Sequence, residues 1–147
     1  MWFEDLTECN YFGEKYSKIL TAVGWLENGK QFSTGKIPRD VYFKLCEFSK
    51  TPWRFAIFMG YHSCDLCQFQ FENDSAKGNS NIFIPYNSKI YVCPGLITHY
   101  INNHFYLPPR EFIEAVYVCP PQGSMEYLKK MLENGGRELV KMMKEHK

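Results

Sequence analysis

The amino-acid sequence predicts an α+β fold, in which a small antiparallel β-sheet packs against C-terminal helices. Short apolar runs typical of strands dominate the N-terminal part of the chain. From Pro94 onward, apolar residues recur three and four positions apart, as in helices. The 147 residues have the usual length of one domain and contain neither a repeat nor a linker. We therefore expect a single domain that spans residues 1–147.

The front of the chain is interpreted from turn residues and apolar spacing. Turn signals within residues 1–35 favour short strands and loops. Residues 37–48 predict an amphipathic helix that begins near Pro38, because their apolar positions are four and three apart. Strands are expected at 52–60, 67–74, 82–86 and 89–93, the last two joined by a hairpin loop.

The back of the chain shows helical spacing in three stretches and ends in a short helix over residues 137–147. Proline and glycine pairs separate these stretches, and Ser124 is expected to cap the third helix at its N-terminus. The helical residues expected to face the core are Val41, Leu45 and Phe48; Leu96, Ile97, Tyr100, Ile101 and His104; Phe112, Ile113, Val116 and Tyr117; and Met125, Leu128 and Leu132.

Charge and hydropathy disfavour several classes of protein. The net charge is +1 and no block of five or six like charges occurs, so nucleic acid is not expected as a partner. Glu4, Asp5 and Glu8 stand where a signal peptide requires basic and then apolar residues, and no apolar run is long enough to span a membrane. We expect a cytoplasmic protein without a membrane partner, whose six cysteines are free thiols or metal ligands.

The stretch GYHSCDLC, residues 60–67, concentrates one histidine and two cysteines at a predicted bend between strands. Cys64 and Cys67 have the Cys-x-x-Cys spacing of a zinc-knuckle-like hairpin, which presents both sulfur atoms on one side. A structural zinc site needs two further ligands, and the four residues between His99 and His104 fall within the range known for paired histidine ligands. The sequence predicts Zn²⁺ bound by Cys64, Cys67, His99 and a fourth ligand.

Two histidines compete for the fourth position. Five residues turn a regular helix through about 500°, which leaves His99 and His104 roughly 140° apart around the axis. Both reach one ion only if the helix ends or tightens near His104, and the Pro108–Pro109 pair favours such an end. His62 is the alternative, because it lies two residues before Cys64 and on the same face of an extended segment. The choice stays open, with the spacing in favour of His104.

Other interpretations of these residues compete with the metal site. Cys64 and Cys67 also suit a redox dithiol, but such a pair opens a helix, whereas strand-like alternation follows Cys67. His104 on an apolar stripe also suits a core histidine. A catalytic zinc needs an open position and a general base, and Asp65, the local carboxylate, is expected to accept a backbone hydrogen bond in the turn. The remaining cysteines, expected in the core, are Cys9, Cys46, Cys93 and Cys119.

The segments VGWLENG and GYHSCDLC and the run from NIFIPY to KKML together resemble an uncharacterised family of small bacterial proteins, over roughly residues 23–132. The shared pattern is similar to G-x-H-x-C-x-L-C followed by N-x-F-I-P and H-Y-I-x-x-H-x-Y-x-P-P. Cys93 departs from it, since a small residue such as alanine is expected there. The resemblance implies that the following residues match the family's pattern: Gly60, His62, Cys64, Cys67, Pro85, His99, Tyr100, His104, Pro108 and Pro109.

No activity comes with that resemblance, which implies a site and leaves the function unnamed. We expect a cytoplasmic zinc-binding module whose ion clamps the hairpin to the helix that carries His99. It is expected to act by binding another protein, in a regulatory, defence or toxin-immunity setting. The alternatives are a metal-dependent enzyme with an open zinc site, in which His62 or His104 is a base or a ligand, and a thiol redox protein.

Overall fold

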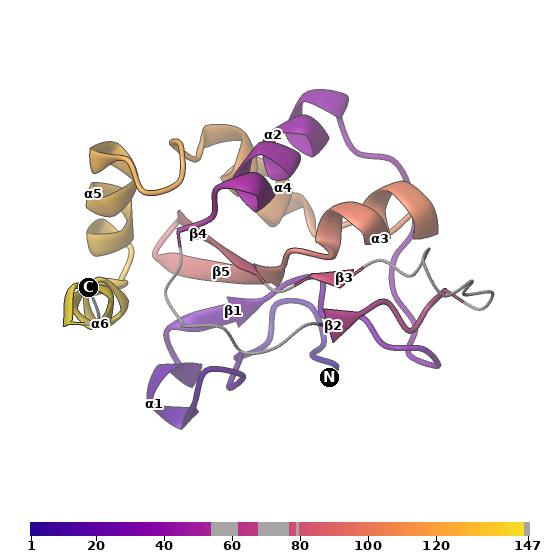
Figure 1. Ribbon diagram of the computed structural model, residues 1–147, viewed down its shortest axis with the longest axis horizontal. Coiled ribbons are helices and arrows are strands. Elements are labelled where there is room, and N and C mark those ends of the chain that lie inside the picture. The colour runs from indigo at the N-terminus through magenta and orange to yellow at the C-terminus, as the bar shows by residue number, and fades with distance from the viewer. Residues whose placement is uncertain (54–61, 68–76, 79, 146–147) are drawn as a thin grey trace.

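The computed structural model describes residues 1–53, 62–67, 77–78 and 80–145 (Figure 1). Its elements in chain order are α1 (Glu14–Ser17), β1 (Leu20–Ala22), α2 (Arg39–Lys50), β2 (His62–Ser63), β3 (Lys77–Gly78), β4 (Asn81–Tyr86), β5 (Lys89–Pro94), α3 (Ile97–His104), α4 (Arg110–Val118), α5 (Met125–Glu133) and α6 (Arg137–Glu145). Helices and a small sheet that pack together confirm the predicted α+β class.

The predicted hairpin forms the centre of the fold. The sheet has the strand order β1-β5-β4, and β4 pairs antiparallel with β5, with Tyr86 opposite Lys89. The two turn residues, Asn87 and Ser88, have φ angles of 51° and 64°, the left-handed values that a type I′ hairpin turn requires. Most residues of both strands are buried, so the hairpin supplies the core against which the helices pack.

The expectation of an antiparallel sheet is wrong for the third strand. β1 runs parallel to β5, with Leu20 opposite Ile90 and Ala22 opposite Val92. Parallel strands need a long crossover connection, and the chain between β1 and β5, which includes α2, provides one. Because β1 has only three residues, it has no alternation from which its partner can be inferred.

Helices α2, α3 and α4 lie on one side of the sheet, while α5 and α6 stand at the end that carries the β4–β5 turn (Figure 1). Ser124 caps α5 as predicted, since its Oγ accepts a hydrogen bond from the Tyr127 N–H. Tyr117 is an exception to the predicted stripes, with 63% of its surface exposed. The stripes are confirmed by the burial of Val41, Leu45, Phe48, Leu96, Ile97, Tyr100, Phe112 and Val116.

The stripe predicted for α5 is wrong at two of its three residues, since only Leu128 is partly buried against the core. Met125 is 83% exposed and Leu132 is 50% exposed, whereas Tyr127 and Met131 are fully buried. The Tyr127 hydroxyl donates a hydrogen bond of 2.7 Å to the carbonyl of Phe83. Because this contact satisfies its polar tip, the tyrosine ring is buried at little cost and the helix faces the core with Tyr127 and Met131.

Two predicted strands cannot be compared with the structure. The strand predicted at 52–60 and the one at 67–74, which includes the second arm of the knuckle-like hairpin, lie almost entirely outside the described residues. Strand β2 is described, and it pairs antiparallel with β3, with His62 opposite Gly78. β2 leads directly into Cys64, so it positions the first cysteine of the candidate site.

Candidate metal centre

Four metal-ligating side chains converge where the turn after β2 meets α3. Cys64 follows β2, and the two residues after it form a turn that brings Cys67 back beside it. His99 lies in the first turn of α3, and His104 is the last residue of that helix. The ligand atoms of these four side chains all lie within 4.8 Å of one another. The structure thus brings together four of the five predicted ligands.

Four of the six distances between these atoms match the corresponding edges of a tetrahedron around one ion. Cys67 Sγ lies 3.3 Å from His99 Nε2 and 3.5 Å from His104 Nε2. Cys64 Sγ lies 3.4 Å from His104 Nε2, and the two Nε2 atoms are 3.3 Å apart. Tetrahedral zinc with bonds of about 2.3 Å to sulfur and about 2.05 Å to nitrogen separates sulfur from nitrogen by about 3.6 Å and two nitrogens by about 3.3 Å. The four groups therefore fit one coordination sphere.

The end of α3 removes the geometric obstacle that a five-residue spacing raises. Phe105 follows His104 in a left-handed conformation with a φ of 57°. The N–H groups of Phe105 and Tyr106 both donate to the carbonyl of Tyr100, which closes the helix. The rings of His99 and His104 meet with centroids 5.0 Å apart and planes at 74°. The helix therefore ends at His104. As expected from the sequence, this end allows both imidazoles to reach one ion.

Burial favours the neutral forms of two of these side chains in the absence of an ion. Cys64 is buried, and burial together with the neighbouring Cys67 thiol raises the pKa of Cys64 to about 11. Burial and the neighbouring His104 imidazole lower the pKa of His99. A divalent cation stabilises thiolates, so its binding at this site would release protons from the cysteines.

The turn between the cysteines is tied to a distant part of the chain. Asp65 Oδ2 accepts a hydrogen bond of 3.4 Å from the backbone N–H of Asn28, 37 residues away, rather than from its own turn. A cavity of about 110 Å³ is lined by Ser63, Asp65 and Tyr100, which are chain neighbours of Cys64 and His99, but by none of the four ligands. No spacing in the sequence links these residues, because only the tertiary fold brings them together.

The remaining residues singled out from the sequence are His62, the alternative fourth ligand, and the four cysteines expected in the core. The backbone of His62 belongs to β2, but its side chain lies outside the described residues. Among the residues that are described, no second group of three or more His, Cys, Asp or Glu side chains is arranged to hold a metal. The cysteines predicted for the core are buried at Cys9, Cys93 and Cys119 and half-buried at Cys46.

The fold and the site define an α+β protein with a Cys₂His₂ group that can hold a metal ion. The chain belongs to the family described as a domain of unknown function, DUF7919, which matches residues 1–117. This range includes all four clustered ligands, while α5 and α6 follow it. No curated protein and no solved structure matches the chain. None of the described helices combines the length and apolar character needed to cross a membrane.

Proposed function

We propose that the protein is a zinc-binding module in which the ion has a structural role. The tetrahedral spacing of four donor atoms from two separate parts of the chain carries the proposal. Thiolate and imidazole ligands suit zinc, whereas magnesium and calcium prefer oxygen ligands. Four protein ligands fill the tetrahedron and leave no open position, which is the arrangement of structural zinc sites.

The ion would fasten the turn at residues 64–67 to the helical layer. α3 directly follows the central strand β5 and packs against α2, so a clamp on α3 also restrains both neighbours. The hydrophobic core extends beyond the site through all helices from α2 to α6. We therefore expect zinc to stabilise a fold that already has a core, unlike the smallest zinc modules, which are unfolded without metal.

Metal analysis tests this proposal. Protein purified from zinc-sufficient medium is expected to carry close to one zinc per chain, and Cys67→Ala and His99→Ala are expected to lose most of it. Asn103→Ala is a matched control, because Asn103 is exposed on the same helix and outside the cluster. Zinc near zero in the unaltered protein, with free thiols at Cys64 and Cys67, would refute the proposal.

We further propose that the protein acts by binding a polypeptide in a groove between α2 and α4. The groove has a volume of about 330 Å³. Its apolar walls are formed by Pro38, Val41, Ile113, Tyr117 and Val118. Asp40 and Glu114 also line it, and the only ion pair of Glu114 among the described residues is with the exposed Arg110, a contact that is weak in water. The matching partner is a segment with an apolar side chain next to lysine or arginine.

A pair of variants tests the groove. The double substitution Tyr117→Asp and Val118→Asp removes the exposed apolar wall, whereas Leu132→Asp changes an apolar residue of similar exposure on α5. A partner protein that fits the proposal is retained by the unaltered chain and by Leu132→Asp, is lost with the double variant, and binds more weakly in purified form as salt is raised. Equal retention by all three proteins would refute the groove as the binding surface.

The cavity lined by Ser63, Asp65 and Tyr100, which are chain neighbours of Cys64 and His99, keeps a metal-dependent enzyme as a second candidate. A catalytic zinc has three protein ligands and a bound water, so this candidate requires one of the four clustered side chains to leave the ion. The redox alternative is disfavoured within residues 62–67, because Cys64 and Cys67 flank a turn and not the start of a helix. Coordination number, measured on the zinc-loaded protein, separates the structural from the catalytic role.

A further inference from the structure

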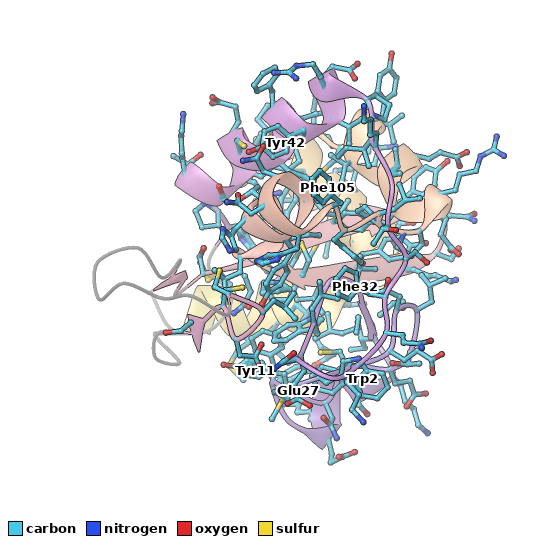
Figure 2. The ribbon with its side chains drawn as sticks, turned by 90° about the vertical axis from the view of Figure 1, so that its right-hand side faces the viewer. Trp2, Tyr11, Glu27, Phe32, Tyr42 and Phe105 are labelled. Atoms are coloured by element: carbon cyan, nitrogen blue, oxygen red, sulfur yellow. The ribbon has the colours of Figure 1, made fainter. Side chains whose placement is uncertain are left out.

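A pocket whose lining includes no cysteine or histidine combines aromatic rings with carboxylates. It has a volume of about 200 Å³ and lies between the N-terminal segment and the loop around Phe32. Trp2, Phe3 and Phe32 supply aromatic walls, and Glu4 and Asp5 supply the acidic groups. Trp2 and Phe32 lie on the same face of the molecule (Figure 2). The volume is several times the roughly 30 Å³ that one water occupies in the liquid, so a small organic ligand fits.

The aromatic walls are held by the core, and one of them already attracts a cation. Phe3 packs edge-on against Trp25 with ring centroids 5.5 Å apart. Phe32 packs in the same way against Tyr106 at 6.1 Å. The exposed indole of Trp2 carries a stacked ammonium group, since Lys30 Nζ lies 4.9 Å from its centroid and Lys30 does not line the pocket.

The carboxylates of the pocket lack a positive partner. Asp5 Oδ1 accepts a hydrogen bond of 3.0 Å from the Gly24 N–H, and Oδ2 accepts one of 2.7 Å from the Tyr106 hydroxyl. Burial, with a smaller contribution from the neighbouring Glu4, raises the pKa of Asp5. Among the described residues, neither Glu4 nor Asp5 forms an ion pair. The two carboxylates are therefore not neutralised by an ion pair, and the Lys30 ammonium stacks on Trp2 without lining the pocket.

We propose that this pocket binds a small organic cation that carries a methylated ammonium group, such as choline. Aromatic faces attract such a cation through their quadrupoles, and the nearby carboxylates neutralise its charge. An anion would be repelled by Glu4 and Asp5, and a hydrated metal ion would gain little from three aromatic rings. The site is independent of the cysteine and histidine cluster, so it stands whether or not zinc binds there.

Titration of the purified protein with choline, followed by amide and indole NMR signals, tests the proposal. The matched neutral probe is 3,3-dimethylbutanol, which has the same shape without the charge. Choline is expected to shift the Trp2 indole signal and the amide signal of Ser33, another residue that lines the pocket, and to bind at least about tenfold more tightly than the alcohol. Tetramethylammonium is expected to produce the same shifts.

Two variants and a control complete the test. Trp2→Ala and Glu4→Gln are each expected to weaken choline binding about tenfold, as followed through the Ser33 amide. Phe43→Ala is the control, because Phe43 is 53% exposed and carries a stacked Arg39 but lies outside the pocket. Equal affinity for choline and the alcohol would overturn the proposal, as would no shift up to about 10 mM choline or unchanged binding in both variants.

Discussion

Replacement of His104 by alanine distinguishes a metal ligand from a histidine that only packs in the helix stripe. His104 Nε2 lies 3.3, 3.4 and 3.5 Å from the donor atoms of His99, Cys64 and Cys67. Its removal leaves three ligands. Mutation of residues that hydrogen-bond to metal ligands commonly lowers metal affinity by about 10–100-fold. Loss of a ligand itself is therefore expected to lower zinc affinity at least about 100-fold, or by about 2.8 kcal/mol of binding free energy.

This loss translates into a thermal shift. When both proteins are saturated with zinc, the difference in binding free energy appears as a difference in stability. A chain of this size changes its Tm by about 2–4 °C per kcal/mol, so His104→Ala is expected to melt about 6–11 °C below the unaltered protein. With excess chelator the difference is expected to fall to less than half, because the His104 side chain is only half-buried.

Thermal unfolding of each protein with zinc and with chelator provides the assay. Asn103→Ala is expected to melt like the unaltered protein under both conditions, and His62→Ala is expected to retain its zinc. A His104→Ala difference of full size in chelator would show that the residue contributes packing and not ligation. Zinc loss with His62→Ala but not with His104→Ala would assign the fourth position to His62.

Three further predictions follow from the same contacts. Cys64 must lose a proton to bind zinc, and its pKa is raised to about 11, so the apparent zinc affinity should rise at least about tenfold per pH unit from pH 6 to 8. A zinc affinity that does not change with pH, measured by competition with a chelator, would contradict thiolate ligation. Tyr106→Phe leaves Asp5 without its 2.7 Å donor and should cost about 1–3 kcal/mol in urea unfolding, whereas a neutral result would deny that this bond matters. Ser88→Gly should stabilise the protein by about 1 kcal/mol, because glycine suits a φ of 64°, and a loss of stability would speak against the type I′ turn.

Local sequence patterns were enough to predict those helices and strands that depend on residues close together in the chain. The β4–β5 hairpin has two apolar strands on either side of a polar turn, and α2 has its buried residues at helical spacing. The candidate ligands could also be predicted, because a Cys-x-x-Cys pair together with two histidines that have four residues between them matches the ligand spacing of zinc sites. These features depend on residues that are close in sequence.

Features that depend on tertiary contact could not be predicted. The parallel pairing of β1 depends on strand β5, about seventy positions later, and the core face of α5 depends on a carbonyl of β4 that accepts from Tyr127. The sequence indicated only that α3 had to end near His104 if both histidines bind one ion. It did not locate that end, since phenylalanine is not a residue that ordinarily adopts the left-handed conformation at a helix end. The pocket near Trp2 joins two segments with no shared motif.

X-ray absorption spectroscopy at the zinc edge of the purified protein identifies the atoms bound to the ion and so tests the four-ligand site directly. We expect one zinc per chain with two sulfur ligands at about 2.3 Å and two nitrogen ligands at about 2.0 Å. In Cys64→Ser, a lighter ligand is expected to replace one sulfur. A first shell without sulfur, a shell of three protein ligands and a water, or a protein that binds no zinc with both thiols free would each contradict a structural site built from Cys64, Cys67, His99 and His104.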